Sequence, residues 1–262
     1  MPAPGFIFLT AHNLGTDQEV ASWQERAQVG NAETLARVMP SLRSGLEKQY
    51  RVQQRLFGQK HQSVAEYVRV DFSCYCGLAL FKFERRINGA DTAWASYRLL
   101  HYAGHAPMPG SIPEVGKRYA TLICALMHPL SRGSVHVASA DPLAPPAIDP
   151  NYFANDVDLD VIVNIVEKSL QLFCTEPLRK HVKRQVLPVA DAIAKGREGL
   201  REYVRGACGN VFHPVGTAAM MSREDGGVVN VSLKVHGTSN LRVVSVPSVI
   251  VQPSTNVSLH GT

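Results

Sequence analysis

Ten histidines offer this chain its main choice of side chains for proton transfer. An imidazole of near-neutral pKa can accept a proton at physiological pH. His213 stands apart from the others, because it lies between Phe212 and Pro214 in a segment of small residues. The proline restricts the backbone, and Gly216 leaves room for a ligand nearby. The residues alone leave two interpretations open: a general base for a substrate hydroxyl, or a histidine hydrogen-bonded inside a turn.

The same survey argues against a metal centre. His101 and His105 are four residues apart, but Gly104 and Pro107 interrupt the helix that such a zinc-binding pair needs. The five cysteines are odd in number and lack the spacing of metal ligands. We therefore predict no metal site and no disulfide framework.

Composition narrows the class of protein. Of 262 residues, 45% are hydrophobic and 19% charged, with a formal net charge of +5. These values are typical of a globular protein with one large domain or two small ones. Lysine and arginine are scattered, and their densest run, at 179–184, is expected to follow a helix end. We therefore expect no nucleic-acid partner. No apolar run approaches the ~18 residues of a membrane span, so no membrane partner is expected either, and the compartment is left open.

Apolar periodicity predicts a mixture of helices and strands. Residues 17–57 have helical spacing with a break at Met39–Pro40, and an apolar, aromatic run at 68–83 is typical of a strand or buried wall. Asn155 or Asp156 is expected to cap an amphipathic helix. Because the elements do not alternate as βαβ units, they favour an α+β fold, an antiparallel sheet backed by helices. Further expected elements are strands at 119–127 and 134–138, loops at 103–117 and 129–133, and a helix at 198–204.

Four segments in a fixed order carry a resemblance to a known family. They are His213–Met220, His128–Val137 with its continuation to Phe153, Gly226–Asn230, and Asn240–Val244. Together they resemble the C-terminal half of the glucose–methanol–choline (GMC) family of FAD-dependent oxidoreductases, and in particular its fungal aryl-alcohol oxidases and dehydrogenases. The residues before about position 118 more weakly resemble the variable substrate region of fungal members.

The resemblance implies a fold in two parts. Residues 1–205 would form the substrate-binding domain, with the family's C-terminal motifs from about 118, and 206–262 would carry the catalytic histidine back toward an FAD-binding domain. It also implies FAD as cofactor and a small-molecule alcohol as substrate. No Gly-x-Gly-x-x-Gly turn for a dinucleotide occurs in the sequence. A separate FAD-domain polypeptide is therefore a candidate partner.

The resemblance further assigns roles to single residues. His213 is expected to take the hydroxyl proton while hydride passes to the flavin, and Asn256 is expected to hydrogen-bond the same oxygen. Phe212 and His260 are expected beside the substrate. The expected flavin contacts are Asn210, Pro214, Val215, Ser245 and Val246.

Two other functions stay open. Some GMC relatives are cyclases or lyases, which use the acid–base groups of the same pocket without a redox step. A truncated, inactive remnant would act only as a binding module. Loss of turnover on replacing His213 with alanine would separate the two enzymes from the remnant, and flavin dependence would separate the two enzymes from each other.

Overall fold

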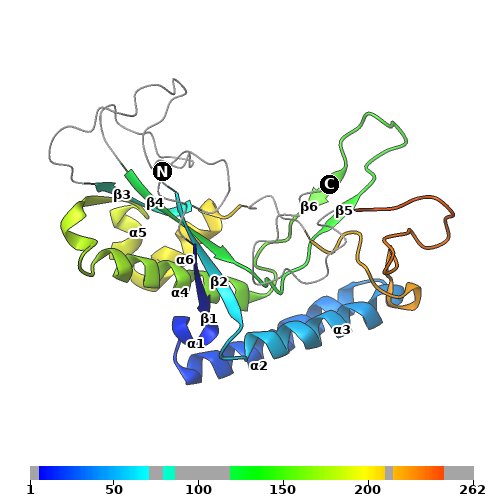
Figure 1. Ribbon diagram of the computed structural model, residues 1–262, viewed down its shortest axis with the longest axis horizontal. Helices are drawn as coiled ribbons and strands as arrows, with labels where there is room; N and C mark the ends of the chain where they lie inside the picture. The colour runs from blue at the N-terminus through cyan, green and yellow to red at the C-terminus, as the bar shows by residue number, and fades with distance from the viewer. Residues whose placement is uncertain (1–5, 71–78, 86–118, 210–214, 245–262) are drawn as a thin grey trace. The chain divides into compact units, whose positions relative to one another are not determined.

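The computed structural model describes residues 6–70, 79–85, 119–209 and 215–244 (Figure 1). The chain forms two compact units, and each is built from three separate stretches of sequence. Unit 1 takes its described residues from 1–9, 65–126 and 159–212, and unit 2 from 10–64, 127–158 and 213–262.

Two long helices dominate the first part of unit 2. They are α2 (Asp17–Arg37) and α3 (Pro40–Phe57), preceded by the short α1 (Ala11–Leu14). Helix α2 begins with a capping box, because the Thr16 hydroxyl accepts from the Glu19 amide at 3.3 Å while the Glu19 carboxylate accepts from the Thr16 amide at 2.7 Å. Pro40 opens α3, where its missing N–H costs no hydrogen bond. The predicted helical stretch and its break are confirmed.

A five-stranded sheet forms the body of unit 1, in the order β1-β2-β4-β3-β7. Strands β2 and β3 both pair antiparallel with the central β4, and β7 pairs antiparallel with β3. The α+β class predicted from the sequence is thus confirmed. The strand bounds are β1 Phe6–Thr10, β2 Ser63–Val70, β3 Ala79–Arg85, β4 Tyr119–Leu126 and β7 Val182–Leu187.

Helix α4 (Asp156–Phe173) covers this sheet. The Tyr67 hydroxyl of β2 donates to the backbone oxygen of Ile165 at 2.5 Å, and the Cys124 thiol of β4 lies 3.5 Å from the Ser169 hydroxyl. The helix buries almost every side chain from Val157 to Val166, so it lies within the core. Burial raises the pKa of the Cys124 thiol, which is therefore an unreactive core group.

Two further helices, α5 (Ala190–Ala194) and α6 (Gly196–Ala207), complete unit 1. Arg201 of α6 forms an ion pair with the nearly buried Asp160 of α4. Arg197 of α6 donates to Glu167 at 2.9 Å, about two turns farther along α4. These pairs fasten α6 to the polar edge of α4.

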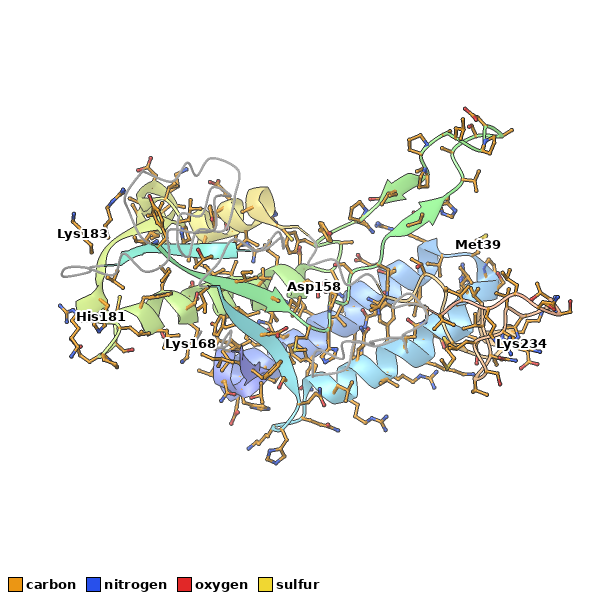
Figure 2. The ribbon with its side chains drawn as sticks, turned by 45° about the horizontal axis from the view of Figure 1, so that its top comes forward. Met39, Asp158, Lys168, His181, Lys183 and Lys234 are labelled. Carbon is orange, nitrogen blue, oxygen red and sulfur yellow. The ribbon has the colours of Figure 1, made fainter. Side chains whose placement is uncertain are left out.

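The basic run predicted to follow a helix end begins six residues after α4. It forms the 3-10 turn η1 (Arg179–His181) and the start of β7. Lys168 of α4 lies at the same end of unit 1 as His181 and Lys183 (Figure 2). All three side chains are exposed, so this end of the unit is a solvated basic face.

Unit 2 also contains a two-stranded ribbon, β5 (Ser134–His136) with β6 (Ala147–Asp149). Val135 pairs with Ile148, and residues in register project from the same face of a ribbon. Both side chains are exposed, as is Val137, which is 88% exposed. The ribbon therefore has one apolar face turned to solvent.

The remaining predicted strands and helices are present in the described residues. The strands expected at 119–127 and 134–138 and the helices expected near 155 and 198 are present as β4, β5, α4 and α6. The expected loop at 103–117, and residues 71–78 of the apolar run, lie outside the described residues. Within the described ranges no helix is long and apolar enough to cross a membrane.

Candidate active site

The described part of the predicted catalytic segment begins at Val215, two residues after His213. Gly216 has a φ of +87°, a left-handed conformation that favours glycine, and a Cβ built there would meet open space. Farther along, the backbone oxygen of the buried Ala219 accepts hydrogen bonds from the amides of Val228 and Val229, at 2.9 and 3.3 Å. The catalytic segment is thus attached, within six residues of His213, to the loop that follows it.

Most of the predicted site residues cannot be placed. Val215 is described and is half-buried. The other candidates lie outside the described residues: Asn210, Phe212, His213, Pro214, Ser245, Val246, Asn256 and His260. Their assigned roles stay predictions.

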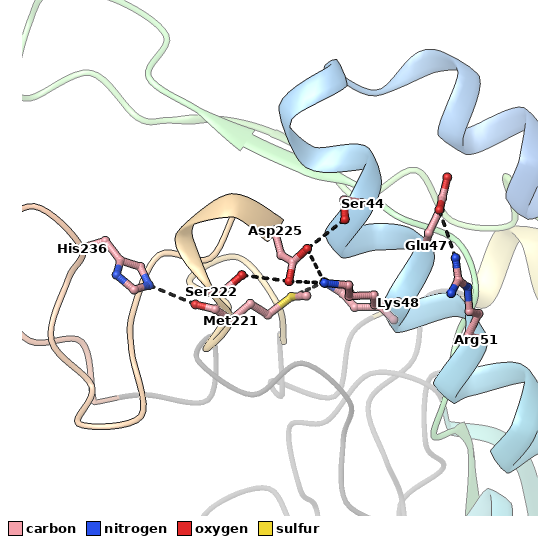
Figure 3. Close-up of polar contacts among 9 residues, drawn as sticks. Ser44, Glu47, Lys48, Arg51, Met221, Ser222, Asp225 and His236 are labelled. Carbon is pink, nitrogen blue, oxygen red and sulfur yellow. Dashed lines mark hydrogen bonds and ion pairs between the residues drawn. The ribbon is translucent and has the colours of Figure 1, made fainter.

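The loop after the catalytic segment is fastened to helix α3 by a group of residues that we call the clasp: Ser44, Gly45 and Lys48 of α3, with Ser222 and Asp225. The Asp225 carboxylate lies in the 3-10 turn η2 (Arg223–Asp225). It accepts from Ser44 at 2.9 Å, from Lys48 at 2.6 and 2.7 Å, and from Ser222 at 2.8 Å (Figure 3). These hydrogen bonds, with that from Lys48 the largest contribution, lower the pKa of Asp225 to about 2.

Backbone packing reinforces the clasp. A Cβ on Gly45 would collide with the backbone oxygen of Asp225, so only glycine at this point of α3 allows η2 to lie so close. Gln49, in the next turn of the helix, donates to the Met221 sulfur at 3.3 Å. The His236 ring lies 3.0 Å from the Met221 backbone oxygen, on the other side of the loop (Figure 3).

A second fixed point in unit 2 is the turn after β4, where the resemblance to the family begins. The buried Asp158 carboxylate accepts from the Leu130 amide at 2.8 Å and from the Ser131 amide at 2.7 Å. Burial raises the pKa of Asp158, and the hydrogen bonds from Leu130 and Ser131 oppose that shift. Asn155, just before α4, accepts from the Val157 amide at 3.1 Å, as predicted for a helix cap.

Arg132 closes this turn. Its guanidinium donates to three successive backbone oxygens, those of Pro129, Leu130 and Ser131, and to the Gln53 side chain at 2.8 Å. It also lies over the Tyr50 ring, 5.3 Å from its centroid. The turn is therefore bound to α3 from one side and to the start of α4 from the other.

His128 opens the same turn and is buried. Neither ring nitrogen has a hydrogen-bond partner among the residues that the structure describes. Burial lowers the pKa of His128, and the Ser63 backbone offsets this only in part. A buried, neutral imidazole is typical of a space-filling core residue.

Sequence reasoning did not identify the clasp or Asp158. Lys48 and Asp225 are 177 positions apart, and no local pattern links them. Asp158 did carry a signal, because it is a carboxylate three residues after the helix cap, in a stretch that is mostly apolar from Val157 onward. Among the described residues, no group of three or more His, Cys, Asp or Glu side chains could hold a metal ion.

The family model described as GMC oxidoreductase matches residues 129–261, which is half of the chain. The chain belongs to this family, and the match corresponds to the family's C-terminal part.

Curated relatives agree with this assignment. The chain is 43% identical over 120 residues to the GMC oxidoreductase family protein Mala s 12 of Malassezia sympodialis. The aligned stretch covers 46% of this chain and 19% of that protein. It is 34% identical over 130 residues to an alcohol dehydrogenase [acceptor] of Pseudomonas putida, and this aligned stretch covers 50% of this chain and 23% of that protein. The matched stretches thus span about a fifth of these relatives.

Solved structures cover more of the chain. A fungal aryl-alcohol oxidase matches 95% of this chain and 35% of its own, with a TM-score of 0.63 and 27% identity. An FAD-dependent oxidoreductase from Chaetomium thermophilum matches the same shares with a TM-score of 0.65, and at 19% identity it shows the fold alone. The chain therefore corresponds to about a third of a complete structure of this kind.

The cofactor of the family is FAD. Of the predicted flavin contacts, Val215 alone lies among the described residues; it is half-buried and precedes the left-handed Gly216. No glycine-rich turn for the pyrophosphate occurs in the sequence, so this sequence does not fit the ADP moiety of FAD.

Proposed function

We propose that this chain supplies the substrate-binding and proton-transferring part of an FAD-dependent oxidoreductase acting on CH–OH groups. The observation that carries the proposal is the family match over 129–261, which contains the whole His213–Met220 segment. The similarity to an aryl-alcohol oxidase and to an alcohol dehydrogenase supports a primary or aryl alcohol as the substrate class.

In the proposed reaction, the His213 imidazole takes the proton of the substrate hydroxyl. The Asn256 amide donates a hydrogen bond to the same oxygen and so stabilises the charge that develops on it. Phe212 and His260 line the alcohol pocket. A bound FAD would supply the acceptor for the hydride of the carbinol carbon, so that loss of the proton to His213 and of the hydride would leave a carbonyl compound.

The proposed contacts of the flavin are Asn210, Pro214, Val215, Ser245 and Val246. They lie in the part of the chain, 206–262, that we propose returns toward an FAD-binding domain, whereas 1–205 forms the substrate-binding domain. Because the sequence has no pyrophosphate-binding turn, we propose that the ADP moiety is held by residues outside this sequence, for example on a separate FAD-domain polypeptide.

The first experiment is the visible absorption spectrum of the purified chain after incubation with FAD and desalting. Retained flavin bands that bleach on addition of an aryl alcohol, in wild type but not in His213→Ala, would support the proposal. His181→Ala is the matched control, because it removes an exposed imidazole from unit 1. A protein that holds flavin and bleaches equally well without His213 would contradict the role of the base.

A colourless protein would show that this chain alone does not bind flavin. Adding the FAD-binding part of a family member would then separate two outcomes. Recovered bleaching would support a partner-dependent oxidoreductase. If no bleaching is recovered, the result would favour the flavin-independent cyclase or lyase, or an inactive remnant.

A further inference from the structure

The C-terminal part of unit 2 carries the motif Asn-x-Ser at Asn230, Val231 and Ser232. An asparagine followed by any residue except proline, and then by serine or threonine, is the acceptor sequence for N-linked glycans. A transferase can use such a motif only where the side-chain amide is accessible. The sequence holds a second copy at 256–258, which lies outside the described residues, so only the surroundings of Asn230 are known.

The motif at Asn230 lies on an exposed turn. Val231 is 89% exposed, and Ser232 is exposed as well. The turn spans 230–233 and is closed by a hydrogen bond of 2.8 Å from the Leu233 amide to the Asn230 backbone oxygen. The two residues that follow the asparagine are therefore open to a large partner.

The side chain of Asn230 is held in one orientation. Its Oδ1 accepts from the Ser232 amide at 2.9 Å and from the Lys234 amide at 3.1 Å. Because only the oxygen of an amide group accepts, these two bonds fix which end of the side chain faces the turn. Within the described part of the chain, neither the Asn230 Nδ2 nor the Ser232 hydroxyl has a hydrogen-bond partner. The two side-chain groups that define the motif are thus both available.

We propose that Asn230 is an acceptor site for an N-linked glycan. In this reaction Nδ2 bonds to the anomeric carbon of an oligosaccharide carried on a lipid pyrophosphate. The bond from that carbon to the pyrophosphate breaks, and the lipid pyrophosphate leaves with its electron pair. One amide proton passes to a base of the oligosaccharyltransferase, and nothing is oxidised or reduced. Since Oδ1 takes no part in the new bond, its two hydrogen bonds to the turn are kept in the product.

A glycan on this turn restricts where a partner can bind. N-linked glycans are bulky and hydrated, so the surface around Val231 stays in contact with water. The turn lies in the stretch 206–262, which we propose returns toward an FAD-binding domain. The turn at 230–233 is then on the side of this stretch that the FAD-binding domain leaves uncovered. The glycan itself does not depend on the proposed redox function, because no residue of the motif at Asn230 takes part in it.

The test uses the full chain, produced in yeast behind a cleavable secretion signal. Chain is collected from the endoplasmic reticulum and from the medium, and loss of the signal shows that a molecule has entered the lumen. Trypsin then places Asn230 on the peptide 224–234 and Asn256 on the peptide 243–262. Peptide N-glycosidase in heavy-oxygen water converts a glycosylated asparagine into a labelled aspartate, which mass spectrometry assigns to one of the two peptides.

We expect the label on the peptide 224–234 in most of the signal-cleaved chain. Ser232→Ala should abolish this label, because it removes the hydroxyl of the motif but keeps the backbone amide that donates to Asn230. Ser232→Thr restores a hydroxyl and should keep the label. Ser258→Ala is the matched control: it removes the hydroxyl of the second motif and should leave the label at Asn230 unchanged.

The proposal is overturned if signal-cleaved wild type carries an unlabelled asparagine on the peptide 224–234. A label confined to the peptide 243–262 would overturn it equally, since the second motif would then be the acceptor. Persistence of the label in Ser232→Ala would show that the label does not report the motif. Ser232→Thr guards against misfolding as the cause of a lost label, because both variants change the same exposed side chain.

Discussion

Replacing Asp158 with alanine tests whether one buried carboxylate holds the turn after β4. Its oxygens accept from the amides of Leu130 and Ser131, and the carboxylate and Leu130 are both buried. In Asp158→Ala these two N–H groups lose their acceptor and gain no other from the new side chain. The turn then has to open toward water or keep unpaired donors.

The size of the loss follows from those two donors. Each buried N–H left without a partner costs about 1–3 kcal/mol, so the pair costs about 2–6 kcal/mol. Burial raises the pKa of Asp158, which shows that the carboxylate carries a desolvation cost that alanine does not. We therefore expect about 3 kcal/mol, a large part of the ~5–15 kcal/mol by which a typical domain is stable.

Urea unfolding followed by circular dichroism measures this loss as a lower midpoint at unchanged slope. Asp156→Ala is the matched control, because Asp156 is an exposed acid in the first turn of the same helix. Asp158→Asn should fall between the two, since its amide oxygen still accepts a hydrogen bond. If Asp158→Ala lies within about 0.5 kcal/mol of Asp156→Ala, the turn does not depend on the carboxylate and the reasoning is refuted.

Three further predictions concern other buried or paired groups. His128→Phe should be at least as stable as wild type near pH 7. Because burial lowers the pKa of His128 below its ordinary 6.5, wild type should lose stability as pH falls below about 6.5. The urea midpoint should therefore fall between about pH 7 and about pH 5.5 in wild type only. The pKa of Asp225 is lowered from 3.8 to about 2, so its stabilising effect is present above about pH 4 and is lost as pH falls toward about 2. The urea midpoints of wild type and Asp225→Asn should therefore converge over that pH range. A constant difference between the two midpoints would contradict the ion pair. Arg201→Met should lower the free energy of unfolding by about 2 kcal/mol, because the nearly buried Asp160 loses its nearer cation while Arg197 lies 3.9 Å away. An unchanged calorimetric melting temperature would count against the pair.

The local elements could be predicted because their signals are local. The Thr16–Glu19 capping box, Pro40 at the start of a helix and Asn155 before α4 each act within a few residues. The pairing of β3 with β7 could not be predicted, since it joins strands about a hundred residues apart and their register shifts twice. The clasp is equally non-local, and neither a lysine on a helix nor an aspartate in a turn is unusual alone.

The site was predicted by resemblance rather than by geometry. The segment from His213 carried the resemblance through the order of its residues, and the family match over 129–261 confirms the assignment to the family. The roles of His213 and Asn256 stay predictions, because both residues lie outside the described part of the chain. Asn230, the last residue of the resembling segment Gly226–Asn230, accepts from the Ser232 and Lys234 amides at 2.9 and 3.1 Å. An amide oxygen is therefore sufficient to form this turn.

The alternation of the chain between its two units fixes when either can be completed during synthesis. The chain changes unit after residues 9, 64, 126, 158 and 212, so unit 1 receives its last segment only after residues 10–64 and 127–158 of unit 2 have been synthesised. Until then the face of β4 that carries Cys124 lacks its partner Ser169, which follows 45 residues later. Contacts between distant segments form slowly and leave apolar strands uncovered meanwhile. We expect the nascent chain to depend on chaperones, and no single cut in the gene to yield either unit as one continuous fragment.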